Sequence, residues 1–275
     1  MQIVDLDALV SRIPDGAKLA IPKDDTGAPI ASTLALIRRG IRNLHIVCVP
    51  IAGLQADLLI GAGCVATIET SAVSLGEFGP APRFNAAVKQ GTVRIIDGTC
   101  PAIYAGMQAG QKGTPFMPLR GIIGSDLLEQ RADWKIIENP FVPGDLMVAI
   151  KAIEPDVALF HALAADRYGN VFLGRDRDGM LLAHASRRAL VTVEQIVEGN
   201  LLDDSARSGS VLPALYVSAI AHVPRGTWPA KFGELTGVDA DVMARYAKAA
   251  RSEEGFEQML EELNAHFAAR QQQEA

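Results

Sequence analysis

Short apolar runs recur along the chain and alternate with amphipathic segments. Each run is almost continuously apolar, as at residues 44–50. A strand exposed on one face would instead alternate apolar and polar side chains. Strands buried on both faces of a parallel sheet have this pattern, because helices cover each face. Strands are therefore expected at residues 18–21, 44–50, 65–69, 92–96, 147–150, 157–161 and 189–193.

The segments between these runs carry helix start and stop signals. Pro29 suits the first turn of a helix that ends at Arg39, where Gly40 follows, and Thr99 suits the N-cap of a helix that begins at Pro101. Further helices are expected at 6–13, 84–90 and 180–188, whereas 215–221 fits either a strand or a helix. The alternation predicts an open, mostly parallel α/β sheet with helices on both faces.

The composition changes to helix-forming residues near position 239. Two amphipathic stripes follow, the first through Val242, Tyr246 and Ala249, and the second from Phe256 to Phe267. We therefore divide the chain into an α/β domain at residues 1–238 and a helical extension at 239–275. The apolar stripes are expected to pack either on the chain's own sheet or on a partner subunit.

Several loops begin where a predicted strand or apolar run stops. In open α/β sheets, ligands gather beyond the carboxyl ends of the strands. The loops expected at this edge are 22–27, 50–53, 69–79, 97–101 and 120–126.

Composition and charge narrow the function classes. The 275 residues carry a formal charge of −6, and this acidity argues against a nucleic-acid binder. Three cysteines without close pairing indicate a reducing compartment. The first residues do not have the pattern of a signal peptide, and no apolar run reaches the ~20 residues of a membrane span. We expect a cytoplasmic protein without a membrane partner.

The most distinctive string is residues 115–126. Arg120 supplies a planar, permanently charged donor for a carboxylate or phosphate, and Gly121 and Gly124 allow backbone N–H groups to approach an anion. Together with Ser125, these residues are candidate ligands of substrate or coenzyme. The alternative is a structural turn in which Arg120 forms a surface salt bridge.

A second polar group lies at residues 69–77. Glu69, Ser71, Ser74 and Glu77 combine carboxylates with hydroxyls, which could bind a substrate or perform acid–base chemistry. Serine and glutamate also serve as ordinary capping and turn residues, so that interpretation stays open.

Asp97 ends a predicted strand and is, with Glu77, a candidate catalytic carboxylate in this chain. It could instead act as the anion at the N-terminus of the helix that begins at Pro101.

Other chemistries lack their motifs. The sequence contains no P-loop and no Gly-x-Ser-x-Gly elbow, and residues 61–63 lack the third glycine of a dinucleotide fingerprint. His161, His184, Glu194 and Glu198 do not have the spacing of metal ligands, so structural roles are expected for them and no metal is predicted.

At these residues the chain resembles the alpha (A) subunit of the family I coenzyme A transferases of the glutaconate CoA-transferase type. The segments that carry the resemblance are 57–63, 69–77, 99–101, 115–126, 165–171 and 191–198. Residues 241–250 also resemble the tail of the alpha subunit of a steroid-ring-opening CoA hydrolase of the same superfamily. The resemblance covers nearly the whole chain.

The resemblance implies a ping-pong reaction through covalent intermediates. The nucleophile that attacks the acyl-CoA is a glutamate of the beta subunit, and a glutamyl-CoA thioester then passes CoA to a small organic acid. The chain described here would need that beta subunit, would hold no permanent cofactor, and would supply groups that recognise the acid and stabilise an oxyanion.

One departure from the family pattern concerns the loop after the first strand. Alpha subunits of transferases have a glycine-rich loop there, whereas this chain reads Pro22-Lys-Asp-Asp-Thr-Gly27. The departure favours a second hypothesis, an acyl-CoA hydrolase or ring-opening enzyme that uses an alpha-subunit carboxylate near Asp97. A third hypothesis is a sensor that binds a CoA ester without turnover.

Overall fold

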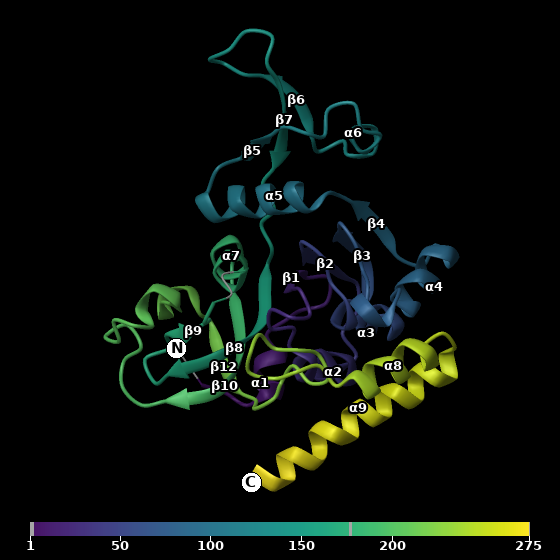
Figure 1. Ribbon diagram of the computed structural model, residues 1–275, viewed down its shortest axis with the longest axis vertical. Coiled ribbons are helices and arrows are strands. Elements are labelled where there is room, and N and C mark those ends of the chain that lie inside the picture. Colours follow the sequence, from purple (N-terminus) through teal and green to yellow (C-terminus); the bar gives the residue numbers. More distant parts are fainter. Residues whose placement is uncertain (1–2, 176–177, 275) are drawn as a thin grey trace.

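A parallel sheet forms the centre of the computed structural model, which describes residues 3–175 and 178–274 (Figure 1). Its parallel strands run in the order β4-β3-β2-β1-β8-β10-β12. These strands are β1 (Lys18–Pro22), β2 (Leu44–Val49), β3 (Val65–Thr70), β4 (Arg94–Asp97), β8 (Val157–Asp166), β10 (Ala189–Val197) and β12 (Ala219–His222). The predicted open, mostly parallel sheet is confirmed.

Helices cover both faces of this sheet, as predicted. On one face, Leu19, Ile46 and Ile68 pack against α1 (Leu6–Val10), α2 (Ile30–Arg39) and α3 (Leu54–Gly61). On the other face, Ala20 and Val47 pack against α5 (Cys100–Lys112) and α7 (Asp178–Ala185). Successive residues of a strand point to opposite faces, so each continuous apolar run fills two cores. Helix α4 (Pro82–Gln90) contacts α3 at the edge.

Local signals placed several helix ends correctly. Gly40 ends α2 in the left-handed conformation at φ 76°, which a glycine adopts without strain. The Thr99 hydroxyl accepts a hydrogen bond from the N–H of Ala102, so Thr99 caps α5 as expected. The segment 215–221, for which strand and helix were both open, contains a short 3₁₀ turn followed by β12.

A second, smaller sheet corrects the prediction for residues 115–126. Here β5 (Phe116–Leu119) and β6 (Lys135–Glu138) each pair antiparallel with β7 (Leu146–Lys151). Loop 120–126 therefore follows an antiparallel strand and does not lie at the carboxyl edge of the parallel sheet. The short helix α6 (Leu127–Gln130) lies in the same region.

Helix α5 joins the two sheets. Its residues Ile103 and Met107 face the parallel sheet, while Ala102 and Ala105 pack with Trp134 and the inner side of the small sheet. In Figure 1, α5 lies between the parallel sheet and the projecting β5–β7–β6 region. A single helix thus has two buried flanks.

The remaining short strands form a hairpin beside the long strand β8. Strand β9 (Val171–Phe172) pairs antiparallel with the end of β8 and with β11 (Val211–Leu212). The turn between β8 and β9 is organised by Asp166, whose Oδ1 accepts hydrogen bonds from the N–H groups of Gly169 and Asn170.

The C-terminal helices α8 (Ala240–Ala249) and α9 (Glu253–Glu274) pack on the chain's own helical layer. The Tyr246 hydroxyl donates to Asp57 of α3 at 2.8 Å, and both side chains are buried. A Cβ added at Gly61 of α3 would lie 2.6 Å from the Phe256 ring, so the helices approach closely there. Of the two alternatives for the apolar stripes, packing within the chain is the one observed.

Within the described residues, every helix is too short or too polar to cross a bilayer.

Candidate functional site

The carboxyl ends of β1, β2 and β3 bring three loops together. Asp24 follows β1, Gly53 follows β2, and Ser74 and Glu77 follow β3. All four line one hollow of about 250 Å³, which we call the Asp24 hollow. This edge is where open α/β sheets bind ligands, and two sequence-predicted site residues are present there.

Asp24 is the residue of this hollow whose pKa differs most from its ordinary value. One carboxylate oxygen, Oδ2, accepts a hydrogen bond from the Leu54 N–H at 2.6 Å, at the start of α3. The other, Oδ1, is buried and has no hydrogen-bond partner among the described residues. Burial is the main cause that raises the pKa of Asp24 to about 6; backbone N–H groups of residues 53–55 oppose it, and the neighbouring charge of Asp25 adds to it.

Gly53 gives Asp24 its place. A Cβ at residue 53 would lie 2.3 Å from the Asp24 Oδ2 atom and 2.7 Å from the backbone oxygen of Ser74. Only glycine therefore lets the three loops meet at this distance.

The predicted serines of the 69–77 segment make local contacts. The Ser71 hydroxyl donates to the backbone oxygen of Pro50 at 2.9 Å and lies 3.1 Å from the Cys100 sulfur at the start of α5. The Ser74 oxygen accepts from the Gly76 N–H at 3.2 Å, inside its own exposed loop. Glu77 is exposed at the wall of the Asp24 hollow.

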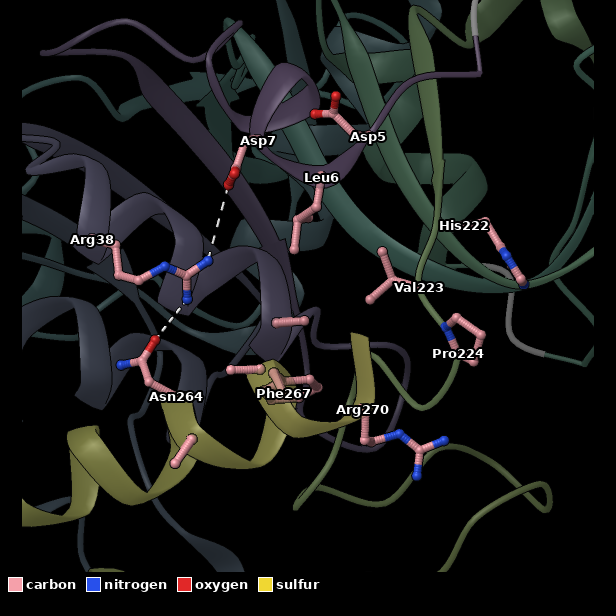
Figure 2. A pocket seen from close by; sticks show the side chains of 13 residues that line it. Asp5, Leu6, Asp7, Arg38, His222, Val223, Pro224, Asn264, Phe267 and Arg270 are labelled. Atoms are coloured by element: carbon pink, nitrogen blue, oxygen red, sulfur yellow. Dashed lines mark hydrogen bonds and ion pairs between the residues drawn. The ribbon is translucent and has the colours of Figure 1, made fainter. Parts of the chain in front are cut away.

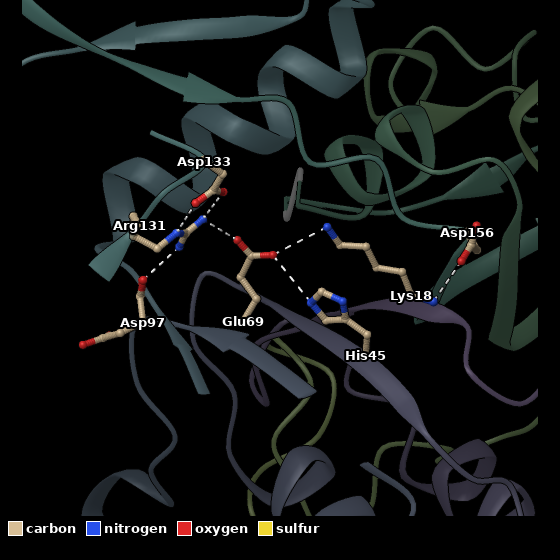
Figure 3. Close-up of polar contacts among 7 residues, drawn as sticks. All are labelled: Lys18, His45, Glu69, Asp97, Arg131, Asp133 and Asp156. Carbon is tan, nitrogen blue, oxygen red and sulfur yellow. Dashed lines mark hydrogen bonds and ion pairs between the residues drawn. The ribbon is translucent and has the colours of Figure 1, made fainter. Parts of the chain in front are cut away.

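Glu69 does not reach this hollow. Its buried side chain points to the α5 side of the sheet, where it meets two cationic side chains and a histidine (Figure 3). The Glu69 carboxylate accepts from Arg131 Nη2 at 2.9 Å and lies 3.5 Å from Lys18 Nζ and 3.7 Å from His45 Nε2. We call Lys18, His45, Glu69 and Arg131 the Glu69 cluster.

Charge compensation determines how Glu69 titrates. Burial alone would raise its pKa, but the contacts with His45, Lys18 and Arg131 outweigh burial and lower the pKa below its ordinary value. Arg131 also holds Asp133 at 2.9 Å and the backbone oxygen of Asp97 at 2.8 Å. The cluster therefore ties the segment before β6 to the ends of β3 and β4.

Asp97, a predicted catalytic candidate, is exposed to solvent and makes one local hydrogen bond. Its Oδ1 accepts from the adjacent Gly98 N–H at 2.8 Å. It lines a cavity of about 570 Å³ with the Glu69 cluster, so the structure separates Asp97 from Glu77.

The Arg120 loop is separated from the other candidates by the division into two sheets. Arg120 is exposed and forms an ion pair with Asp145, which lies just before β7. Gly121 and Gly124 both have positive φ, and the Ser125 hydroxyl accepts from the Leu127 N–H at 3.3 Å, within the turn that begins α6. These contacts match the alternative interpretation of a structural turn with a surface salt bridge.

Two of the residues that lacked metal spacing, His161 and Glu194, have structural contacts. His161 lies 2.8 Å from both Thr192 and Glu194, in a buried network between β8 and β10. Glu194 also accepts from the backbone N–H of Arg225 at 2.7 Å. Among the residues that the structure describes, no group of three or more histidine, cysteine or acidic side chains could hold a metal ion.

A further cavity, of about 590 Å³, marks the junction with the C-terminal helix (Figure 2). Arg38 of α2 donates to Asn264 of α9 at 2.6 Å and lies 4.0 Å from Asp7 of α1. These contacts connect three helices, so we assign this cavity to helix packing.

Sequence reasoning missed Asp24 and Arg131. Loop 22–27 was expected at the ligand edge and was noted as a departure from a family pattern, but no residue in it was named as a candidate, although two adjacent aspartates close to the end of a buried strand were a usable signal. Arg131 carries no local motif, because its partner Glu69 lies 62 positions earlier and only the fold brings them together.

The sequence profile of the coenzyme A transferase family matches residues 3–222. The A-type subunit of the 3-oxoadipate CoA-transferase of Pseudomonas knackmussii is 34% identical over 83% of this chain and 81% of its own length. The cholesterol ring-cleaving hydrolase IpdA subunit of Rhodococcus jostii is 26% identical over 94% of this chain and 90% of its own length.

A crystal structure of a variant of the decarboxylase AibA/AibB has a similar fold. It superposes with a TM-score of 0.81 at 31% identity, over 94% of this chain and 98% of that chain. Chains similar to this one therefore include a decarboxylase and the subunits of a transferase and a hydrolase.

Proposed function

Because this chain belongs to the coenzyme A transferase family, we propose that it is the alpha subunit of a heteromeric CoA-transferase. The enzyme would be cytoplasmic and would move CoA between an acyl-CoA and a small organic acid, through a glutamyl-CoA thioester on the beta subunit. The observation that carries the proposal is the match to the A-type subunit of a transferase, at 34% identity over most of both chains.

The state of the chain's own glutamates supports a nucleophile on the partner. A nucleophilic carboxylate must be accessible and uncommitted to attack a thioester. Glu69 is buried among Arg131, Lys18 and His45, and Glu194 is bound to His161 and a backbone N–H. Glu77 is exposed at the wall of the Asp24 hollow, and among the described residues no hydrogen bond or ion pair of its side chain holds it in an orientation for attack.

The role left for this chain is to form one wall of the reaction site. The loops after β1, β2 and β3 meet at the Asp24 hollow, with the Ser74 hydroxyl and the Glu77 carboxylate on its wall. Oriented backbone N–H groups and hydroxyls at such an edge can stabilise the oxyanion of a thioester under attack. The Arg120 loop, exposed on the small sheet, stays a predicted ligand site that the partner would have to complete.

Trapping of the thioester tests this proposal. The chain is purified as a complex with its partner, incubated with an acyl-CoA, and treated with borohydride, which reduces a glutamyl-CoA thioester. We expect loss of exchange activity and a reduced glutamate on the partner only, with no adduct on this chain. An intact partner after incubation with a broad set of acyl-CoAs would contradict transfer through a glutamyl thioester.

Asp24 favours a second candidate function, hydrolysis of an acyl-CoA. Water needs a base to attack a thioester, whereas the carboxylates exchanged by a transferase do not. A carboxylate with a pKa of about 6 is ionised at neutral pH and basic enough to accept that proton. The water oxygen would bond to the carbonyl carbon, its proton would pass to Asp24, and the C–S bond would break to release CoA thiolate.

The two functions differ in what Asp24→Asn should do. In a transferase, the variant retains exchange between an acyl-CoA and an acid to within about tenfold. In a hydrolase, release of CoA falls by about 10²–10⁴, the usual contribution of a general base. Both rates are measured on the same complex, with acid present or absent, so that one preparation decides between them.

A further inference from the structure

A second hollow lies on the other side of the loop that carries Asp24. It has a volume of about 750 Å³ and shares Lys23 and Asp25 with the Asp24 hollow, so the two are neighbours along one loop. We call it the apolar hollow, because five of its lining residues are large and apolar: Leu163, Phe172, Leu173, Phe232 and Leu235.

The apolar side chains of this wall are only partly covered by the rest of the chain. Leu163 and Phe172 are only half-buried, and Leu235 is 52% exposed. Gly174 has a φ of +71°, and a Cβ at that position would lie 2.5 Å from the Leu163 Cδ1 atom. The side chain of Leu163 therefore occupies space that any residue other than glycine at 174 would fill.

The wall is also fixed in place. Phe232 forms an isolated antiparallel bridge with Thr26, and the Gly233 N–H donates to the backbone oxygen of Asp25 at 3.2 Å. The Phe232 ring meets the buried His161 ring edge-on, with centroids 5.0 Å apart. A concave, pre-formed apolar surface with a few polar groups beside it is typical of a small-molecule site.

The cations around this hollow already face carboxylates. Lys23 Nζ lies 3.5 Å from Asp178, and Arg175 donates to Glu234 at 2.6 Å. A second carboxylate on a ligand would have to displace one of these partners or lie unpaired against Leu163 and Phe172. Burial of an unpaired charge is strongly unfavourable, whereas burial of hydrocarbon is favourable.

We propose that the apolar hollow binds the hydrocarbon part of the acyl group, so that the substrates are monocarboxylic acids with an apolar chain or ring of several carbons. This inference rests on the proposed function and specifies its substrate class. Acetate-sized acids would leave the hollow empty, and dicarboxylates would place a charge in it.

A chain-length series tests the inference on the complex with the partner. The acyl-CoA donors are acetyl, butanoyl, hexanoyl and octanoyl, with adipoyl as the charged counterpart of hexanoyl. Each added methylene that enters the hollow should raise kcat/KM about fourfold, from the usual value of a buried methylene. We expect adipoyl-CoA to react at least tenfold more slowly than hexanoyl-CoA. Equal kcat/KM across the series, or preference for adipoyl, would overturn the inference and leave CoA transfer in place.

Two variants locate the effect. Leu163→Phe narrows the hollow, and Leu235→Asp places a charge on its exposed rim, where folding should tolerate it. Both should lower the ratio of octanoyl to acetyl kcat/KM about tenfold, whereas the control Leu215→Phe, at a side chain 86% exposed and outside the hollow, should leave that ratio unchanged. An unchanged ratio in Leu235→Asp contradicts the inference.

Direct binding separates failure of the inference from failure of the proposed function. Octanoate is titrated into the complex by calorimetry, with Leu235→Asp as the comparison. Octanoate binding that Leu235→Asp weakens, without turnover of any acyl-CoA, supports the apolar hollow and refutes the proposed function. Turnover of acyl-CoA without binding of octanoate would refute the apolar hollow as the binding site and leave the proposed function in place.

Discussion

Two carboxylates near the ends of β1 and β3, the strands on either side of β2, have opposite surroundings. Glu69 of β3 meets the cationic side chains of Arg131 and Lys18 and the imidazole of His45, and its pKa lies below the ordinary value. Asp24, just after β1, meets backbone N–H groups on one oxygen only and a second aspartate beside it, and its pKa rises to about 6. Loss of contact with solvent is therefore accompanied by a lowered pKa at Glu69 and a raised pKa at Asp24. The direction differs because cationic partners offset burial at Glu69 only.

The contrast separates a structural charge from a reactive one. A fully compensated carboxylate stays ionised and holds its neighbours, as Glu69 does with Arg131. An under-compensated carboxylate in a cleft has the pKa that proton transfer at neutral pH needs. The two positions therefore predict different failures when either is changed.

The largest effect is expected from Asp24→Asn if water is the acceptor. Release of CoA should fall by about 10²–10⁴, because the amide cannot accept the proton from water. The rate is followed with a thiol reagent on the complex, and Asp203→Asn, at an exposed aspartate outside both hollows, serves as the matched control. Retention of the hydrolysis rate in Asp24→Asn would exclude Asp24 as the base.

The next largest effect is on stability. Arg131→Met removes the main partner of buried Glu69 and should lower the free energy of unfolding by about 3 kcal/mol, at the lower end for a broken buried pair because Lys18 and His45 remain. Urea titration of the chain measures the change. The double variant Glu69→Gln with Arg131→Met should lose less than the two single losses added together; additive losses would mean that the two side chains are not coupled.

The pH dependence of stability should differ in sign between the two carboxylates. The lowered pKa of Glu69 gives stability that is present above its unfolded value and is lost as the pH falls below it. The raised pKa of Asp24 means that the folded chain binds this proton more readily, so its contribution falls as the pH rises from about 4 to about 6.

Urea titrations at several pH values check this pair of signs. Glu69→Gln should flatten the acid side of the stability curve, and Asp24→Asn should flatten the interval from about pH 4 to about pH 6. If both variants change the same interval, the assignment of opposite shifts is wrong.

The smallest effect is expected at the surface pair of Arg120 and Asp145. Arg120→Ala should leave the urea midpoint of unfolding essentially unchanged, because solvent screens this exposed ion pair and the Arg120 side chain is 64% exposed. The KM for the acid is measured on the same variant in the complex. A tenfold rise in KM with unchanged stability would make Arg120 a ligand-binding residue, as the sequence predicted.

The parallel sheet could be predicted from sequence because local signals and the global fold agree there. Continuous apolar runs marked β2 and β8, and Gly40 and Thr99 marked helix ends by their own backbone and hydroxyl chemistry. The small sheet was missed because β5 and β6 have mostly exposed or half-exposed residues, whose pattern indicates a loop as readily as a strand.

The candidate site was predictable only in part. Position after a strand end predicted that Ser74 and Glu77 lie at the carboxyl edge of the sheet, and both line the Asp24 hollow there. The environment of Glu69 was not predictable, since its partners Lys18, His45 and Arg131 are far apart in sequence. Proximity along the chain had grouped Glu69 with Glu77, whereas the fold directs the two side chains into different cavities.

The two buried flanks of α5 connect the small sheet with the carboxyl ends of the parallel strands. Its first residue, Cys100, lies beside Ser71 at the strand ends, and its flank carries the small sheet with the Arg120–Asp145 pair. A partner that displaced the small sheet would therefore disturb the packing of α5, and with it the contact between Cys100 and Ser71. Binding of a partner to the small sheet and the reaction at the strand ends would then be coupled through the thirteen residues of α5.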